Sequence, residues 1–273
     1  MDLEQVARLG KDLKVAAITL SDAEARFLVD AYYTMQAGRI AAANQVRSLT
    51  ESDEPHEVLA WLSANSGLLE RNVLKALDAY SDAHRIGRWC RSIRGIGPVL
   101  SAGLMAHIDI EKAPSVSNIW SFAGLNPTVE WKKGKKRPWN AMLKTLCWKI
   151  GESFVKVSNH DEDVYGHLIA RRKALEIERN ERGDFADLAA QKLERFKIGK
   201  STDAYKSYRA GRLPPAHIHA RAKRWAVKLF LSHWHDVAFF CRYGQRGPKP
   251  LILTEAYGHV DFLQAPGFSF RAE

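Results

Sequence analysis

Cysteine is scarce in this 273-residue sequence, which contains three of them, Cys90, Cys147 and Cys241. An odd number of scattered cysteines with no Cys-x-x-Cys pair suggests neither a disulfide framework nor a cysteine metal site. Such cysteines fit a reducing compartment, and we expect a cytoplasmic protein. No long apolar run could span a membrane. The charged opening MDLEQVARLGKDLK is unlike a signal peptide.

The sequence also lacks the short motifs of several enzyme classes. It has no Gly-x-Ser-x-Gly, no P-loop and no Gly-x-Gly-x-x-Gly followed by a ribose-binding acid. A two-metal nuclease needs carboxylates from separate elements, and no series of apolar strands ends in Asp or Glu. Asp161, Glu162 and Asp163 are instead expected at a helix N-terminus, where negative charge is favourable. We therefore predict no catalytic residue, no metal site and no cofactor.

Acidic residues are outnumbered by basic ones. Asp and Glu total 31 against 41 for Lys and Arg, which gives a net charge of +10 and a pI near 9.5. The hydrophobic fraction, 46%, and the charged fraction, 26%, are ordinary for a globular protein. The excess of positive charge favours an anionic partner, most often nucleic acid. A protein that is merely basic is the alternative.

Apolar residues recur at three- and four-residue spacing through most of the chain, which predicts a mainly α-helical protein. Ser21 and Glu24 form a capping-box pattern at the start of a long helix expected over residues 21–49. A second long helix follows the polar break TESDEP at residues 50–55. Two long helices joined by a short polar turn predict an antiparallel helical hairpin, which either packs on the rest of the protein or dimerises.

We expect the chain to divide into three regions. Residues 1–82 form the N-terminal helical hairpin or coiled coil, and residues 83–158 form a helix-hairpin-helix domain. Residues 159–273 form a basic helical region with an extended or strand-like tail. In this last region YRAGRLPP, at Tyr208–Pro215, is expected to be a linker, and the chain's most regular helix is expected from Ala216 to about Cys241.

The stretch IRGIGPVLSAGLMAHI predicts two helices joined by a two-glycine turn. Gly95 and Gly97 can take backbone conformations forbidden to other residues, and Pro98 suits the first position of the second helix. The turn amides and the helix N-terminus would point the same way, an arrangement that attracts phosphate. The predicted phosphate-binding residues are Gly95, Ile96, Gly97 and Val99.

A dense basic loop, WKKGKKRPW, lies between Trp131 and Trp139. Basic charge interleaved with aromatic rings suits attraction to a nucleic-acid backbone and stacking on exposed bases. A solvated loop whose tryptophans anchor its ends in the core is the alternative. We expect a mixture, in which the tryptophans anchor and the cations bind. The predicted binding residues are Lys132, Lys133, Lys135, Lys136 and Arg137.

The long C-terminal helix carries a stripe of basic residues without an acidic member. At 100° per residue the stripe contains His217, Arg221, Arg224, Lys228, His235 and Arg242. A solvated face is the usual explanation for such charges. We predict phosphate contacts from Arg221, Arg224 and Lys228. The pairs His217/His219 and His233/His235 do not predict a zinc site, because residues two apart on a helix point to nearly opposite sides.

Three motifs between Ile93 and about Leu146 occur in an order that resembles a known family: IRGIGPVLSAGLMAHI, IWSFAGLNP and KKGKKRPWNAMLKTL. They resemble the C-terminal domain of the IS110 group of insertion-sequence transposases. The resemblance implies a helix-hairpin-helix at Gly95–Gly97, the family's AGL-x-P motif at Ala123–Pro127 and a helix start at Asn140–Lys144. The preceding helical hairpin is similar to that family's coiled-coil segment.

The sequence departs from that family in two places. Full members carry an N-terminal RuvC-like domain with an Asp-Glu-Asp-Asp metal site, which we expect to be absent here because the chain begins almost directly in the helical hairpin. The family also places a nucleophilic serine just before the Gly-Lys that corresponds to Gly134 and Lys135. Lys133 stands there instead, and its ammonium group cannot form a phosphoserine linkage.

We therefore predict a transposase-derived nucleic-acid-binding protein of a bacterium or its phage, without strand-transfer activity of its own. Its expected partners are DNA, branched DNA included, or structured RNA, and we expect a homodimer or higher oligomer. One alternative is an active transposase or recombinase with a divergent nucleophile or a partner nuclease subunit. Two others are a binder of structured or guide RNA and a protein whose basic surface meets an acidic protein.

Overall fold

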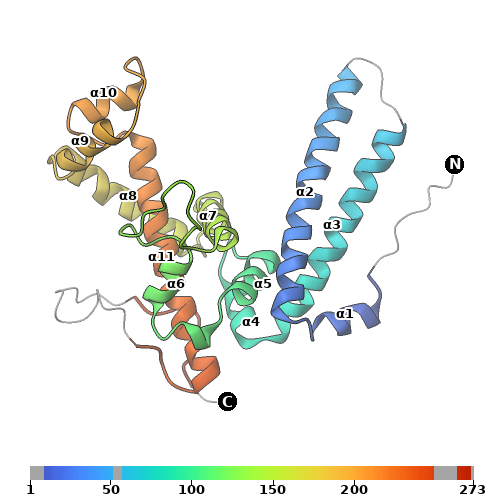
Figure 1. The fold of residues 1–273 in the computed structure, drawn as a ribbon. Helices are drawn as coiled ribbons and strands as arrows, with labels where there is room; N and C mark the ends of the chain where they lie inside the picture. The colour runs from blue at the N-terminus through green and yellow to red at the C-terminus, as the bar shows by residue number, and fades with distance from the viewer. Residues whose placement is uncertain (1–8, 52–56, 249–262, 272–273) are drawn as a thin grey trace.

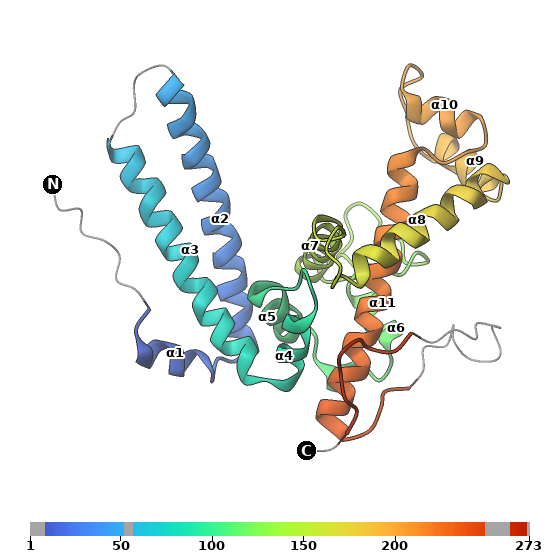
Figure 2. The ribbon, with the colours of Figure 1, turned by 180° about the vertical axis from the view of Figure 1, so that it is seen from behind.

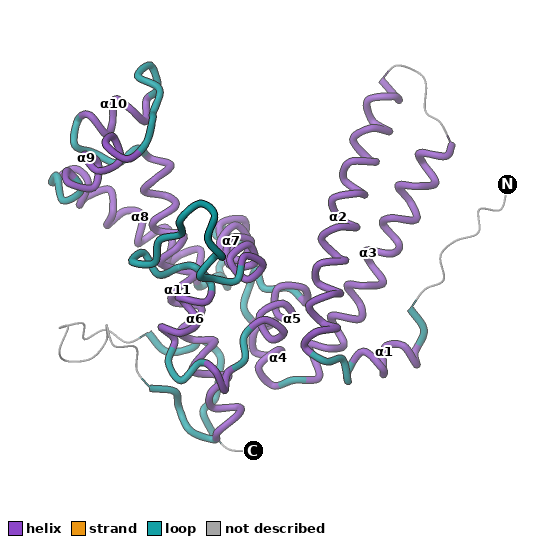
Figure 3. The backbone as a smooth tube through the Cα atoms, in the orientation of Figure 1, coloured by secondary structure: helices purple, strands orange, loops and turns teal. Residues whose placement is uncertain are grey.

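The computed structural model describes residues 9–51, 57–248 and 263–271. Over these ranges the chain forms eleven α-helices and one 3-10 helix and no strand (Figure 3), which confirms the prediction of a mainly α-helical fold. In chain order the elements are α1 (Lys11–Ala17), α2 (Asp22–Glu51), α3 (Glu57–Ala83), α4 (Arg85–Ser92), α5 (Pro98–His107), η1 (Ile110–Lys112), α6 (Val116–Phe122), α7 (Ala141–Lys156), α8 (Tyr165–Glu181), α9 (Ala186–Arg195), α10 (Asp203–Arg209) and α11 (Pro215–Tyr243).

The helices are arranged as a V with two arms (Figures 1 and 2). The long helices α2 and α3 form one arm. The other arm contains α8 and α11, and α9 and α10 lie at its far end. Helices α4 and α5 form the base of the V, and α7 lies between the arms.

The first arm is the predicted antiparallel helical hairpin. The Ser21 amide donates to Glu24 Oε2 (2.8 Å) and the Glu24 amide donates to Ser21 Oγ (3.3 Å), so the capping box is confirmed. Arg39, which interrupts the apolar stripe of α2, pairs with Glu70 of α3 at 2.5 Å. This ion pair therefore links α2 to α3. Most of the predicted polar break, residues 52–56, lies outside the described residues.

The main core joins α4, α5, α7, α8 and α11. At its centre Phe154 of α7 stacks on Tyr165 of α8 with ring centroids 4.7 Å apart, and both rings meet the edge of Phe230 of α11. All three side chains are fully buried. The core thus draws on both the second and the third predicted region, and the boundaries at 82 and 158 stay predictions.

The loop that leads into α11 differs from its prediction as a linker. Leu213 is buried, and the side-chain amide of Asn180 on α8 bonds both of its backbone groups. Asn180 Nδ2 donates to the Leu213 carbonyl (3.0 Å) and the Leu213 amide donates to Asn180 Oδ1 (2.8 Å). Tyr208 lies in the last turn of α10. This segment is therefore packed against α8, because one side chain satisfies the backbone groups that burial would otherwise leave without partners.

The described part of the tail, residues 263–271, has neither helix nor strand. It lies along α4 and α11: the Trp89 indole donates to the Pro266 carbonyl (2.8 Å), and the Arg85 guanidinium lies 4.9 Å from the Phe268 ring centroid. The rest of the predicted extended tail lies outside the described residues. Over the ranges described, we find no helix with the length and apolar character needed to cross a membrane.

Candidate nucleic-acid interface

The two-glycine turn joins α4 to α5 as predicted, but only one of its glycines needs to be glycine. Gly95 has φ of +91°, a conformation that side chains with a Cβ rarely adopt. Gly97 has φ of −90° and ψ of 179°, ordinary extended backbone, and a Cβ there would meet nothing within 4 Å. The expectation that both glycines take special conformations is therefore wrong for Gly97. Pro98 is the first residue of α5, as predicted.

The other two residues predicted in the turn, Ile96 and Val99, bury their side chains. The Ile96 amide donates to the Ile93 carbonyl (2.9 Å) and so closes the turn. Val99 packs its side chain against α2 and α3. Its amide belongs to the first turn of α5, where N–H groups have no carbonyl partner within the helix. A ligand at this turn would therefore meet the backbone of Gly95, Gly97 and the start of α5, and not the side chains of Ile96 and Val99.

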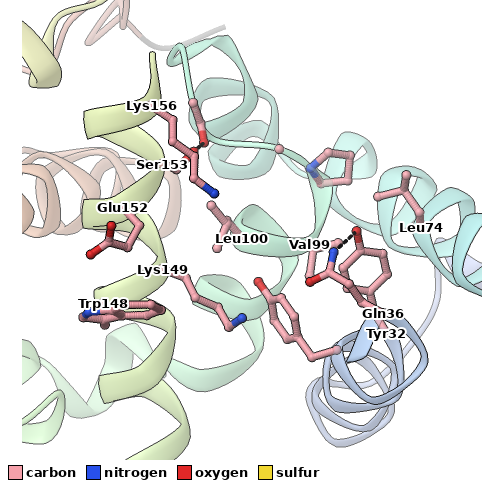
Figure 4. Close-up of a pocket in the computed structure, with 14 residues that line it drawn as sticks. Tyr32, Gln36, Leu74, Val99, Leu100, Trp148, Lys149, Glu152, Ser153 and Lys156 are labelled. Carbon is pink, nitrogen blue, oxygen red and sulfur yellow. Dashed lines mark hydrogen bonds between the residues drawn. The ribbon is translucent and has the colours of Figure 1, made fainter. Parts of the chain in front are cut away.

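A cavity of about 460 Å³ lies beside this turn, bounded by α2, α5 and α7 (Figure 4). Tyr32, Tyr33 and Gln36 line it from α2, and Lys149 and Lys156 line it from α7. The Lys149 ammonium lies 3.8 Å from the centroid of the Tyr33 ring, a cation–π contact. The predicted turn and two lysines that the sequence analysis did not single out therefore share one concave surface.

The charges on this face of α7 are mainly positive. Partial burial lowers the pKa of Lys149, and the neighbouring ammonium of Lys156 lowers it further. Glu152 lies between them in sequence, lines the same cavity and forms an ion pair with Lys223 of α11. The two lysines thus repel one another, and an anion between them would relieve that repulsion.

Sequence analysis missed Lys149 and Lys156 because, in this part of the chain, it singled out the two-glycine turn and the basic loop but not the helix after Asn140. A signal was present, since residues spaced by three, four and seven fall on one side of a helix. Thr145, Trp148, Lys149, Glu152 and Lys156 have that spacing.

The basic loop is exposed over the five residues predicted to bind, Lys132, Lys133, Lys135, Lys136 and Arg137. Trp139 is half-buried and packs on the loop before it: a Cβ at Gly124 would be 2.8 Å from Trp139 Cγ. Trp131 does not anchor the loop in the core. It is 42% exposed, and its indole donates to the Lys135 carbonyl (2.6 Å), which closes the loop on itself.

A second hollow, of about 430 Å³, lies between this loop and α7. It is lined by three tryptophans and by two cations, Arg137 of the loop and Lys144 of α7. The Arg137 guanidinium lies 5.4 Å from the Trp131 ring centroid, and the Lys144 ammonium lies 4.0 Å from that of Trp139. Burial lowers the pKa of Lys144, and the positive charges of Arg137 and Arg224 lower it further. Trp148 of α7 completes the lining.

The predicted basic stripe on α11 is not a continuous exposed face. Arg221 bonds to Glu176 of α8 (2.8 Å), and Lys228 is half-buried with its ammonium 4.2 Å from the Trp120 ring centroid. His235 is buried, and its Nε2 bonds the Ala113 carbonyl (2.9 Å). No acidic residue of α11 lies on that stripe, but Glu176 of α8 pairs with Arg221 there. Arg224 remains exposed.

Arg224 borders a third hollow, of about 590 Å³, between α7, α9, α10 and α11. Lys192, His217 and Lys223 also line it, together with Trp148. Burial lowers the pKa of His217 to about 4, helped by the positive charges of Lys192, Arg224 and Arg221. His217 is therefore neutral at pH 7 in a strongly cationic surrounding.

The histidine pairs of α11 make separate protein contacts. His233 bonds the Tyr165 hydroxyl through Nδ1 (2.7 Å) and the Leu263 carbonyl through Nε2 (2.7 Å), whereas His235 bonds Ala113. Since a carbonyl oxygen only accepts, Nε2 of His233 carries the hydrogen and Nδ1 accepts from Tyr165. Over the described ranges, no group of three or more His, Cys, Asp or Glu side chains could hold a metal ion.

In the ranges that the structure describes, the fold is helical, and its hollows are rich in lysine, arginine and tryptophan. Residues 88–154 form a domain of the Transposase IS116/IS110/IS902 family. This domain runs from α4 to near the end of α7, so it contains the two-glycine turn, the basic loop, Trp148 and Lys149. It covers about a quarter of the chain and confirms the resemblance found in the sequence. No curated protein and no solved structure matches the chain.

Proposed function

We propose that this protein binds nucleic acid, with duplex DNA as its primary ligand, through the concave face of its transposase-family domain. The observation that carries the proposal is the meeting of the α4–α5 turn with Lys149 and Lys156 around one cavity. Backbone amides at a helix start and two neighbouring ammonium groups suit a phosphate. The same segment, residues 88–154, belongs to a transposase family, which supports DNA as the ligand.

The predicted residues take unequal roles in this proposal. Gly97 and the first turn of α5 hold a phosphate, and Lys149 and Lys156 add charge beside it. The exposed loop cations Lys132, Lys133, Lys135, Lys136 and Arg137 extend the contact along the strand. Arg224 supplies a further contact, whereas Arg221 and Lys228 chiefly hold α8 and α6 to α11. Such contacts position a protein on nucleic acid without reading sequence.

Fluorescence anisotropy over a salt series tests the proposal with blunt duplex, branched and single-stranded DNA and a structured RNA. The wild-type protein is compared with Lys132→Gln/Lys133→Gln in the loop and with the matched charge removal Lys11→Gln/Lys14→Gln on α1. Salt-sensitive duplex binding, lost in the loop variant and retained in the α1 variant, is the expected result. Equal binding by all three proteins would refute the interface. Tighter binding of RNA than of any DNA would favour the RNA alternative.

We further propose that the chain lacks strand transfer of its own, because Lys133 occupies the position that the resemblance gives to a nucleophilic serine. Ser153, a hydroxyl near the turn, is engaged with the Gly95 carbonyl. Incubation of the protein with a supercoiled plasmid and Mg²⁺ or Mn²⁺ tests this point. The plasmid should remain supercoiled, and nicking that depends on the metal would favour the active-recombinase alternative.

The homodimer also stays a proposal. Apolar side chains are exposed along the first arm, with Phe27 of α2 72% exposed, and a second copy could cover them. Light scattering after size exclusion should give twice the monomer mass of 30.8 kDa. A mass of one chain at micromolar concentration would contradict it.

A further inference from the structure

Trp148 leaves most of its ring in solvent although its helix is firmly packed. It is 59% exposed, whereas Leu143 and Ile150 on the opposite face of α7 are fully buried. A tryptophan can bury a large apolar area and adds stacking energy when it does so. The ring of Trp148 therefore has a large apolar area that is not buried within this chain. One exposed apolar side chain is ordinary, so its surroundings decide whether it binds anything.

Three hollows adjoin the Trp148 side chain. Trp148 lines all three hollows, the one beside the two-glycine turn, the one beneath the basic loop and the one next to α9 and α10. The indole thus stands where the three concave surfaces meet. A ligand lying in any of them would contact its ring.

The same hollows are lined by cations. Each contains at least two: Lys149 and Lys156 in the first, Arg137 and Lys144 in the second, and Lys192, Lys223 and Arg224 in the third. Lys223 reaches the indole itself, with its ammonium 5.8 Å from the ring centroid. Among the described residues that line the three hollows, Glu152 is the sole acid, and it forms an ion pair with Lys223.

A ligand for this place needs a flat apolar surface and several negative charges. An apolar helix from another protein would satisfy the indole but would leave the cations facing it without partners. A nucleic-acid strand supplies both features, because its bases stack on aromatic rings while its phosphates meet lysine and arginine. The bases of an intact duplex are stacked on one another, so the base concerned must be unpaired.

We propose that Trp148 is a stacking platform for an unpaired nucleobase, whose flanking phosphates are held by Lys149, Lys223 and Arg224. The inference rests on the proposed function and adds the form of the ligand to it. A duplex held at the α4–α5 turn and Lys156 would continue past Trp148 as a single strand. The preferred ligand is then a junction between duplex and single-stranded nucleic acid.

Three DNA ligands separate stacking from charge: a blunt duplex, the same duplex with a single-stranded thymidine overhang, and that duplex with an overhang of abasic sugars. The two overhangs carry the same phosphates and differ only in their bases. Affinities are measured for the wild type, Trp148→Ala, Trp148→Phe and Trp61→Ala. Trp61, on α3 in the other arm, is 40% exposed and serves as the matched control.

The wild type should bind the thymidine overhang about tenfold more tightly than the abasic one, the size expected for stacking one base on an aromatic side chain. Trp148→Ala should bind the two overhangs equally, Trp148→Phe should keep most of the difference, and Trp61→Ala should behave as the wild type. A tenfold difference that persists in Trp148→Ala would overturn the stacking site and leave the proposed function standing. Loss of blunt-duplex affinity in Trp148→Ala to the same extent would also overturn it. Absence of salt-sensitive binding of the blunt duplex by the wild type would instead refute the proposed function.

Discussion

The hydroxyl of Ser153 donates a hydrogen bond to the carbonyl oxygen of Gly95, at 2.5 Å and across 58 residues of sequence. This bond joins the turn between α4 and α5 to α7, the helix that carries Trp148, Lys149 and Lys156. The turn and the cationic face of α7 therefore have a fixed relation to one another. A change that displaces the turn should disturb both the proposed phosphate site and the cavity beside it.

The two glycines of the turn should respond differently to alanine. Gly95→Ala is expected to lower the free energy of unfolding by about 2 kcal/mol, because the new Cβ would hold a positive φ. It would also lie 3.1 Å from Val157 Cγ2. Gly97→Ala should be neutral or stabilising by about 0.5 kcal/mol. Alanine fits the extended backbone at this position, and it lowers the conformational entropy of the unfolded chain. Urea unfolding followed by far-UV circular dichroism measures both, and equal effects would contradict the assigned backbone conformations.

The carboxylate of Glu176 should contribute strongly to the stability of the second arm. It is 1% exposed and accepts from Arg172 and Arg221, at 2.5 and 2.8 Å. Burial alone would raise its pKa, but the hydrogen bonds from the two guanidinium groups outweigh burial, and the pKa lies below its usual value. Glu176→Gln leaves those arginines beside a neutral amide and should cost about 3 kcal/mol of unfolding free energy.

The matched control for Glu176 is Glu178→Gln, the same chemical change at an exposed position of α8. Its cost should stay within about 0.5 kcal/mol. Thermal unfolding of the two variants beside the wild type provides the comparison. Similar melting temperatures for both variants would show that the buried carboxylate contributes no more than an exposed one.

Acid should destabilise the protein partly through His233. Burial lowers the pKa of this imidazole to about 4, against 6.5 in the unfolded chain, and the Leu263 carbonyl and Asp236 offset only part of that effect. Between these values the unfolded chain binds a proton that the folded protein does not. Stability should therefore fall as the pH drops from about 6.5 to 4. The contribution is on the order of 3 kcal/mol, since each pKa unit corresponds to about 1.4 kcal/mol.

His233→Gln keeps a hydrogen-bonding side chain and removes the titration. The variant should lose less stability than the wild type between pH 7 and pH 4, although the lowered pKa values of His217 and His235 leave some pH dependence in both. Urea midpoints at several pH values measure this. An identical pH dependence in the two proteins would mean that His233 titrates normally in the fold.

The lysine pair beside the turn should govern the salt dependence of duplex binding. Each phosphate contact contributes about 0.9 to the slope of log affinity against log salt. Lys149→Gln/Lys156→Gln should therefore reduce that slope by about two. The Lys11→Gln/Lys14→Gln variant removes the same charge from α1 and should leave the slope unchanged. A reduction of equal size in both variants would mean that net charge, and not the cavity, sets the affinity.

Much of the fold could be predicted from the sequence because helix starts and ends depend on neighbouring residues. The capping box of Ser21 and Glu24, Pro98 at the start of α5 and the apolar spacing of α11 act within one or two turns. Short helices such as α1 and α10 were not predicted. They contain too few turns to show a period.

The candidate site was only partly predictable. The basic loop lies exposed where its composition placed it, and the two-glycine turn joins the predicted helices. Lys149, Lys156 and Trp148 were missed, because their importance comes from the elements opposite them. Tyr33 approaches Lys149 from α2, and Lys223 approaches Trp148 from α11. The spacing within α7 places Trp148, Lys149 and Lys156 on one face, but it does not show that Tyr33 and Lys223 lie opposite them.

The sequence by itself determined the helical class, the two long helices of the first arm, the turn at Gly95 and the excess of positive charge. Each of these depends on the residue types present or on their spacing along the chain. Only the tertiary structure decided which charges are available. Arg221 and Arg224 are three residues apart on one helix, yet Arg221 is held by Glu176 from α8 while Arg224 is exposed. That difference arises because ion pairing and burial follow distances in space, which packing of the helices sets.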